Sequence, residues 1–377
     1  MNPVTRYYFD HNATTPVSPE VFQAMAPLMT TVFGNASSIH QFGQEARGEL
    51  DRARRSVAAM LGAKAEEIIF TGGGTEADNM AIFGAGGHVV TTTVEHPAVL
   101  QAAGQLPSAT FVPVDRRGVV DTEAVRAAIR PDTKLISVMH VNNELGVIQP
   151  VREIAEIAHE AGVLFHSDGV QAMGKLPVNV GELGVDFYSI SAHKIYGPKG
   201  MGALYIRKGA ELRPLLYGGP HERKMRAGTE NVAGAVGFGR AAEWVIEESG
   251  AEAARQSALR DRLEQGILTR VAGAYVNGAG ASRVGNTSNI RFDGIDSEPL
   301  LIALDLKGFA VSSGSACSSG ATEPSHVLAA IGLTREQARS SVRFSLGRSN
   351  NQEQIDALID AVVQVVSRLR KLAPAYV

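Results

Sequence analysis

One lysine of the chain stands between an expected strand and a Gly/Pro turn, a position suited to chemistry. Lys194 follows the apolar run 186–190 and precedes Gly197-Pro198. In open α/β sheets, ligands bind beyond the ends of the strands. A lysine that is desolvated there loses its proton and can attack a carbonyl to form a Schiff base. Lys194 is therefore a candidate catalytic residue.

A second apolar run, 163–166, leads to Asp168. A Schiff-base lysine and an aspartate for a pyridinium nitrogen are the protein's part of pyridoxal-phosphate chemistry. Taken singly, a lysine after a strand is usually a solvated surface residue, and an aspartate there is usually a turn residue or a helix N-cap. The prediction therefore depends on the other residues expected at the same strand ends.

The segment 71–77 is rich in glycine, follows the expected strand 67–71 and opens an expected helix. Glycines let the backbone approach an anion, and the first amides of a helix point toward it. Thr75 adds a hydroxyl donor next to Gly74. A flexible turn is the alternative reading, and no Walker-type phosphate loop occurs in the chain. The segment is a candidate phosphate cradle.

Three more polar side chains stand at expected strand ends. His96 follows the strand 88–93 and suits a role over a flat cofactor ring, although a lone histidine is more often structural. Asn143 follows the strand 135–141, and Gln171 comes three positions after Asp168. We expect all of them at the same edge of the sheet, because parallel strands end together.

The chain contains one cysteine, Cys317, in a stretch of serines and glycines. A lone cysteine is usually a small buried hydrophobe, but this neighbourhood has no large side chain to pack against it. Its composition is typical of a mobile loop, which suits a nucleophile that visits a substrate and leaves. One cysteine also excludes an intramolecular disulfide and a multi-cysteine metal cluster, so no metal site is predicted.

Short apolar runs alternate with helix-period segments such as 152–160, which predicts an α/β fold with a mostly parallel, seven-stranded sheet. A helix is expected from about 233 to 270, with a break near Ser249-Gly250. Beyond it we expect strands at 287–292 and 341–344, a helix at 298–306 and a last helix whose apolar stripe runs from 355 to 369. We interpret 14–250 as a large domain, and 1–13 with 251–377 as a smaller α+β domain.

Composition and charge exclude several classes of protein. Lys and Arg number 36 against 39 Asp and Glu, so no basic excess favours nucleic acid. No run reaches the length of a membrane span, and the first residues lack the apolar core of a signal peptide. The sequence therefore predicts a cytoplasmic enzyme that acts on a small molecule.

With these residues in order, the chain resembles the cysteine desulfurases of the nitrogen-fixation and iron–sulfur-assembly type. These belong to the class V aminotransferase superfamily, which are pyridoxal-phosphate enzymes of fold type I. The resemblance covers nearly the whole chain and is carried by the segments 8–16, 34–40, 75–79, 95–96, 142–144, 168 with 171, 191–194, 226–229, 312–320 and 343–348.

The resemblance implies a role in holding pyridoxal 5'-phosphate for many of these residues. Lys194 would hold the cofactor as a Schiff base, Asp168 would pair with its ring nitrogen, and Gln171 with its ring oxygen. His96 would stack on the ring and transfer protons. The phosphate would be held by Gly74, Thr75, Ser191, His193 and, across a homodimer interface, Thr229 of the partner subunit.

The resemblance also implies a substrate and a reaction. Asn143 and Arg343 would bind the carboxylate of L-cysteine, and an arginine fork matches a carboxylate bidentately. Cys317 would take the substrate sulfur as a persulfide, leaving L-alanine, and pass it to an iron–sulfur scaffold or a sulfurtransferase. A selenocysteine lyase or an aminotransferase of the same fold is the alternative, and a non-catalytic sulfur carrier is a third reading.

Two features depart from the family pattern. Gly169 stands where the family often has alanine. The chain also ends soon after its last helix, so we expect it to lack the longer tail with which some members dock a cluster scaffold. The identity of the sulfur acceptor stays open.

Overall fold

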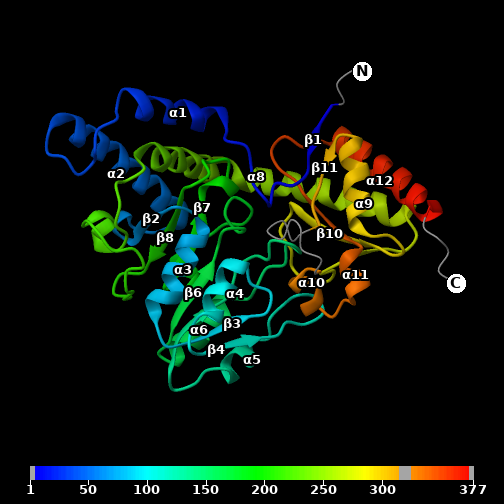
Figure 1. Cartoon of the computed structure of the whole chain (residues 1–377), viewed down its shortest axis with the longest axis horizontal. Coiled ribbons are helices and arrows are strands. Elements are labelled where there is room, and N and C mark those ends of the chain that lie inside the picture. Colours follow the sequence, from blue (N-terminus) through cyan, green and yellow to red (C-terminus); the bar gives the residue numbers. More distant parts are fainter. Residues whose placement is uncertain (1–4, 314–323, 373–377) are drawn as a thin grey trace.

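The computed structural model describes residues 5–313 and 324–372. Within these ranges seven strands form the central sheet, at the lower left of Figure 1, and a smaller sheet lies to its right. In spatial order the central strands are β2 (Ile68–Thr71), β8 (Gly202–Ile206), β7 (Phe187–Ser191), β6 (Leu164–Asp168), β5 (Thr133–Ser137), β3 (His88–Thr92) and β4 (Ala109–Val112).

The central sheet is mostly parallel. The strands β3 to β7 pair in parallel, whereas β8 runs antiparallel to both of its neighbours, β2 and β7. The parallel strands therefore end at one edge, where their connections to the next helices begin. The predicted fold class, an α/β fold with a mostly parallel seven-stranded sheet, is confirmed.

Helices cover both faces of the central sheet because its strands alternate apolar side chains between them. On one face, α3 (Gly74–Ala85) and α4 (Pro97–Gly104) pack on Ile69, Val89 and Leu135. On the other face, α2 (Gln41–Leu61), α6 (Val151–Glu160) and α8 (Val232–Arg270) share a cluster with Phe70, Val90 and Ile136. Strands buried on both sides hold their ends in fixed positions.

The expected break in the long helix is wrong. The helix α8 continues without interruption through Ser249 and Gly250 to Arg270, and in Figure 1 it crosses from the large sheet to the small one. A glycine inside a helix costs only about 1 kcal/mol relative to alanine. Packing of α8 against α1 (Pro19–Thr30), α2 and α12 (Gln352–Leu372) outweighs that cost.

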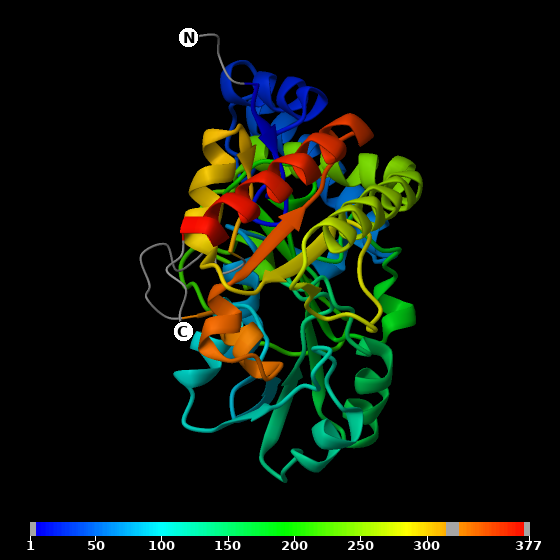
Figure 2. The same cartoon turned by 90° about the vertical axis from the view of Figure 1, so that its right-hand side faces the viewer.

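The smaller region is built from both ends of the chain. An antiparallel sheet of β9 (Ala274–Val276), β10 (Thr287–Phe292) and β12 (Ser341–Ser345) packs on α9 (Ser297–Leu306) and α12. The N-terminal strand β1 (Tyr7–Tyr8) pairs in parallel with β11 (Phe309–Ala310), and Phe9 enters the same apolar cluster. Figure 2, turned toward this region, has α12 crossing in front of its strands.

The central sheet and the smaller region each have their own apolar cluster, as two domains would require. The division into residues 14–250 and 1–13 with 251–377 stays a prediction. The remaining helices are short: α5 (Thr122–Ala127), α7 (Val180–Leu183), α10 (His326–Ala330) and α11 (Arg335–Arg339). None of the helices in the described part of the chain has the length and apolar character needed to cross a lipid bilayer.

Candidate active site

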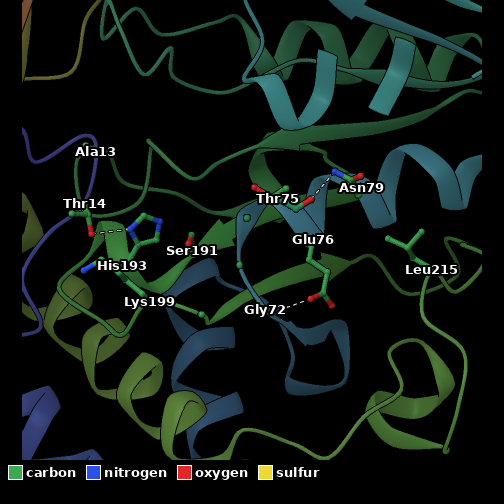
Figure 3. Close-up of a pocket in the computed structure, with 13 residues that line it drawn as sticks. Ala13, Thr14, Gly72, Thr75, Glu76, Asn79, Ser191, His193, Lys199 and Leu215 are labelled. Atoms are coloured by element: carbon green, nitrogen blue, oxygen red, sulfur yellow. Dashed lines mark hydrogen bonds between the residues drawn. The ribbon is translucent and has the colours of Figure 1, made fainter. Parts of the chain in front are cut away.

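A cavity of about 640 Å³ opens at the N-terminus of α3, at the edge where the parallel strands end. Figure 3 shows the side chains around it, which come from the glycine-rich loop, the N-terminal segment and the end of β7. Its lining includes Gly74, Thr75, Ser191 and His193. The structure thus brings together four residues that the sequence assigned to a phosphate.

The glycine at the start of α3 is required by packing. A Cβ on Gly74 would lie 2.7 Å from Cγ2 of Val170, closer than real Cβ contacts allow. The Thr71 side chain holds the glycine-rich loop, because its Oγ1 donates to the carbonyl oxygen of Gly73 over 2.9 Å. The first amides of α3 therefore face the cavity without a side chain in front of them.

His193 borders the same cavity and is held by the N-terminal segment. Its Nδ1 lies 3.0 Å from Oγ1 of Thr14, a contact drawn in Figure 3. Burial, followed by the charges of Lys194 and Lys199, lowers the pKa of His193 to about 4. The imidazole is therefore neutral near pH 7, and its Nδ1 is held by the Thr14 hydroxyl.

Lys194 ends a single 3₁₀ turn, Ala192–Lys194, that follows β7 directly. Its Nζ donates to the carbonyl oxygens of Asn12, over 2.6 Å, and Ala13, over 2.7 Å. The N-terminal segment thus crosses over the sheet edge and holds the amine in place. Two fixed acceptors restrict the amine to one side of the site.

Asp168 is the last residue of β6 and is buried. It accepts a hydrogen bond from the backbone N–H of Val170 over 2.9 Å. Burial raises the pKa of Asp168 to about 6, while the Val170 N–H and the charge of Lys194 act in the opposite direction. A buried carboxylate of this kind gains most from a cationic partner.

His96 caps the N-terminus of α4, and its Nδ1 accepts from the N–H of Ala98 over 3.1 Å. A ring nitrogen that accepts carries no proton, so the proton of the neutral ring is on Nε2. Burial, then the charges of Lys194 and His326, lower the pKa of His96 to about 4. His96 is thus a neutral ring with one defined proton.

Gln171 lies in the turn after β6, and its Nε2 donates to the carbonyl oxygen of Asn12 over 3.0 Å. The same carbonyl accepts from Lys194. Lys194 and Gln171, which the sequence assigned to one cofactor, are therefore joined through a residue of the N-terminal segment.

Asn143 and Arg343 meet, although 200 positions separate them. Nη1 of Arg343 donates to the carbonyl oxygen of Asn143 over 3.1 Å, and its Nη2 pairs with Asp10 over 2.6 Å. The Arg343 side chain is 2% exposed. Oδ1 of Asn143 is buried and has no hydrogen-bond partner among the described residues, which suits a ligand.

Thr229 is not part of this assembly, and Cys317 cannot be placed relative to it. Thr229 is exposed and is absent from the lining of the cavity, although Arg226 of the same loop pairs with Glu76 on α3 over 2.8 Å. Cys317 lies outside the described residues. The chain leads toward it from Ser312, whose N–H donates to the Arg343 carbonyl oxygen over 3.2 Å.

The donor set fits a phosphorylated pyridine cofactor. Helix amides, two hydroxyls and a neutral imidazole suit a phosphate. A buried carboxylate and a lysine lie at the same sheet edge, as a Schiff-base cofactor requires. No group of three or more metal-binding side chains gathers within residues 5–313 and 324–372, so the described site offers nothing comparable to a metal ion.

Comparison with known proteins agrees with this geometry. The family model Aminotransferase class-V matches residues 7–358. The chain belongs to the class-V aminotransferase family. It is 48% identical to the Cysteine desulfurase IscS of Dictyoglomus turgidum, over 97% of this chain and 96% of that protein. The resemblance predicted from the motifs is confirmed.

Solved structures give the same result for this class-V aminotransferase. A NifS-like protein superimposes with a TM-score of 0.90 at 37% identity, covering 97% of this chain and 100% of that one. SspA, solved in complex with cysteine, gives a TM-score of 0.81 at 36% identity, covering 91% of this chain and 99% of its own.

The unusual glycine after Asp168 has a structural reason. A Cβ on Gly169 would overlap the ring of Tyr188 on β7. Tyr188 is fully buried, and its hydroxyl lies 2.7 Å from Nδ1 of His140. In this class-V aminotransferase the tyrosine ring therefore fills the space that an alanine methyl would take.

Sequence reasoning missed three residues of the site. Asp10 and Asn12 lie in a segment that carried the family resemblance but received no role, and Lys175 was not singled out. Asn12 contacts Lys194, Gln171 and Asn143, and Asp10 pairs with Arg343. The available signal was the cluster of polar residues in 10–15 directly after an apolar strand.

Proposed function

We propose that this protein is a cysteine desulfurase that uses pyridoxal 5'-phosphate to convert L-cysteine to L-alanine. The observation that carries the proposal is the meeting of Lys194, Asp168 and the cavity beside the glycine-rich loop at one sheet edge. That edge belongs to a chain 48% identical to a cysteine desulfurase. SspA, a protein of similar structure, binds cysteine in its solved form.

The cofactor would lie between Asp168 and the glycine-rich loop. Gly74, Thr75, Ser191 and His193 would hold its phosphate, and Lys194 would bind it covalently through Nζ. Asp168 would face the ring nitrogen, Gln171 the ring oxygen, and His96 the face of the ring. When bound, the cofactor supplies a sink for electrons released at the substrate α-carbon.

The chain's own groups would move the protons. Lys194 Nζ would serve as the base, and its two carbonyl partners keep it at the site. His96 carries its proton on Nε2 and stays neutral near pH 7, so it can donate that proton and recover it. The crossing N-terminal segment, Asn12 and Ala13, covers this side of the site.

The substrate carboxylate would bind at Arg343 and Asn143. The contacts with Asp10 and with the Asn143 carbonyl oxygen orient the planar guanidinium, whose fork matches a carboxylate. The Asn143 amide NH2 can donate to the carboxylate, and its buried Oδ1 has no partner among the described residues.

Cys317 would take the sulfur. Its thiolate would form a bond to the substrate sulfur as the bond between that sulfur and the β-carbon breaks. The carbon skeleton would then gain a proton and leave as alanine. The persulfide would pass to an acceptor, either an iron–sulfur scaffold or a sulfurtransferase. Ser312, a described residue, donates its N–H to the Arg343 carbonyl oxygen.

A homodimer is also part of the proposal. Several large apolar side chains on α1, on α2 and on the segment that joins these helices are exposed. They are Phe22, Met29, Phe33, Ile39 and Phe42. Such patches on a protein surface mark interaction sites. Covering this patch with a second copy, and bringing Thr229 of the partner subunit to the phosphate, would explain why Thr229 is exposed here. A cytoplasmic location belongs to the same proposal.

The test is to measure alanine and sulfide from L-cysteine with purified protein, pyridoxal phosphate and a reductant. The proposal predicts alanine and sulfide in equal amounts, a cofactor absorbance band, and no alanine from Cys317→Ser. Selenocysteine as substrate tests the lyase alternative. A Cys317→Ser protein that forms alanine as well as the wild type would contradict the persulfide route and favour an aminotransferase.

A further inference from the structure

Lys175 follows Gln171 by one helical turn and points at the same polar cluster. Its Nζ donates to Oδ1 of Asn12 over 2.8 Å and to Oε1 of Gln171. The side chain is only partly buried, but both of its partners are buried. Lys175 also lines, together with Lys194 and Asn286, a small cavity of about 20 Å³.

The Asn12 side chain has a single orientation. Its Nδ2 donates to the carbonyl oxygen of Asn143, over 3.1 Å, and to Oγ1 of Thr287, over 2.9 Å. Its Oδ1 accepts from Nδ2 of Asn286 over 3.0 Å and from Lys175. Rotating the amide by 180° would set donors against donors, so Asn12 presents an oxygen to Lys175 and fixes the position of the lysine.

The fixed lysine in turn determines how Gln171 is oriented. The Lys175 amine donates both to Oδ1 of Asn12 and to Oε1 of Gln171. The carbonyl end of Gln171 therefore faces Lys175. Its Nε2 turns to the other side, where one hydrogen is given to the Asn12 carbonyl oxygen and the second remains for a ligand.

We propose that Lys175 is a positioning residue of the cofactor site: it holds Gln171 so that the amide NH2, and not the carbonyl, faces the ring oxygen of the cofactor. The inference rests on the proposed function, because it presupposes that pyridoxal phosphate binds here. Without Lys175 the Gln171 amide keeps only the hydrogen bond from its Nε2 to the Asn12 carbonyl oxygen, and the amide NH2 is held less firmly toward the ring oxygen.

Two cations, Lys194 and Arg343, act on Lys175. Burial, and then the charges of Lys194 and Arg343, lower the pKa of Lys175 well below its usual range. His11 lies on the same cavity, and burial, with Lys175 second, lowers its pKa to about 4. Burying the Lys175 amine beside these cations costs free energy. Among the described residues, its hydrogen bonds to Asn12 and Gln171 offset that cost.

The experiment is a double-mutant cycle on Lys175→Met and Gln171→Ala, with Lys175→Arg as the conservative variant. Lys134→Met, on an exposed lysine of β5, is the matched control. Two quantities are measured for each protein: the pH midpoint of the absorbance change of bound pyridoxal phosphate, and the dissociation constant of the cofactor. Unfolding of each apoprotein is followed by circular dichroism.

Lys175→Met is expected to raise the pH midpoint by about one unit and to weaken cofactor binding about tenfold, since a donor to an anionic oxygen is lost. Lys175→Arg should restore most of both. In the Gln171→Ala background, Lys175→Met should shift the pH midpoint by no more than about 0.3 units and the dissociation constant of the cofactor by no more than about twofold. Residues that act through one another are not additive. If Lys175→Met does not fold, Lys175→Ala takes its place with the same expectations.

The inference is overturned if Lys175→Met behaves like Lys134→Met, or if its full effect persists without the Gln171 side chain. The second result would mean that Lys175 acts on Lys194 by charge alone. Failure of the proposed function is a different outcome, because then the wild-type protein itself would bind no pyridoxal phosphate.

Discussion

The two sides of the candidate site are held by different physics. On the cofactor side, Asp168, Lys194 and His96 each follow a buried strand of the central sheet, and backbone hydrogen bonds fix where each strand ends. On the substrate side, Asp10 and Asn12 of the N-terminal segment meet β12, where Asp10 pairs with Arg343 and the Asn12 N–H donates to the Ser345 hydroxyl. The first side is a property of the sheet, and the second is a polar network that depends on side chains.

This difference predicts how each side fails. Replacing a residue at a strand end removes its chemistry and leaves the backbone in place. Replacing one member of the polar network leaves its buried partners without hydrogen bonds, which costs more than the lost bond itself. Cofactor-side variants should therefore lose function while staying folded, and substrate-side variants should change binding and folding together.

The strongest test of the cofactor side is Lys194→Ala. Loss of the amine removes both the covalent link and the base, so we expect alanine formation from cysteine to fall by about a thousandfold or more. The thermal unfolding temperature of the apoprotein should change little. Lys199→Ala, on an exposed lysine five positions away, is the control. Turnover within tenfold of wild type would refute the role of Lys194.

A second test uses the charge of Asp168 and the pH. Since burial raises its pKa from 3.8 to about 6, the folded protein holds this proton more tightly than the unfolded chain. The resulting stabilisation is complete below about pH 4 and is lost as the pH rises through 6. At pH 8, Asp168→Asn should therefore stabilise the apoprotein by up to about 3 kcal/mol.

The same substitution should have no stabilising effect at pH 4, where both proteins carry a neutral group. Urea unfolding of the two apoproteins at pH 4 and pH 8 measures the difference. Cofactor affinity should fall in Asp168→Asn because the ring nitrogen loses its carboxylate. An equal gain in stability at both pH values would mean that the charge of Asp168 is not the cause.

Arg343→Lys tests the substrate side. A lysine loses the planar fork that can serve Asp10, Asn143 and a carboxylate together, so KM for cysteine should rise about tenfold. The absorbance of the bound cofactor should not change, in contrast to Lys194→Ala. Arg291→Lys on the adjacent strand is the control. A changed cofactor spectrum with an unchanged KM would reverse the assignment of the two sides.

The smallest change in stability is expected in α8, the helix that runs from the large region to the smaller one. Gly250 is exposed in α8, and a Cβ there would contact nothing within 4 Å. Gly250→Ala should raise the free energy of unfolding by roughly 0.5–1 kcal/mol and leave turnover unchanged. Gly266→Ala, whose Cβ would lie 2.5 Å from Cδ1 of Ile359, should be destabilising. Stabilisation by both substitutions would contradict the packing described.

The cofactor side was predictable from the sequence because its residues obey a local rule. Each lies directly after an apolar strand, so the local pattern alone places Asp168 and Lys194 at one sheet edge. The substrate side could not be predicted in this way. The contacts of Asn12 and Lys175 depend on how the N-terminal segment lies over the site, which no local pattern encodes.

The continuous helix α8 was missed for a related reason. Gly250 is a local signal for a break, and the contacts of α8 with helices from both regions override it. Cys317, which was assigned from composition and resemblance, lies outside the described residues, and its role stays a prediction.

The overlap between a Cβ at Gly169 and the Tyr188 ring restricts how this chain can diverge. A mutation of Gly169 to alanine is tolerated only after Tyr188 has become smaller, and the tyrosine could have arisen only while position 169 was glycine. The two positions are therefore historically linked. Relatives should pair glycine with tyrosine, or alanine with a slimmer side chain, and lineages that carry both larger residues should be absent.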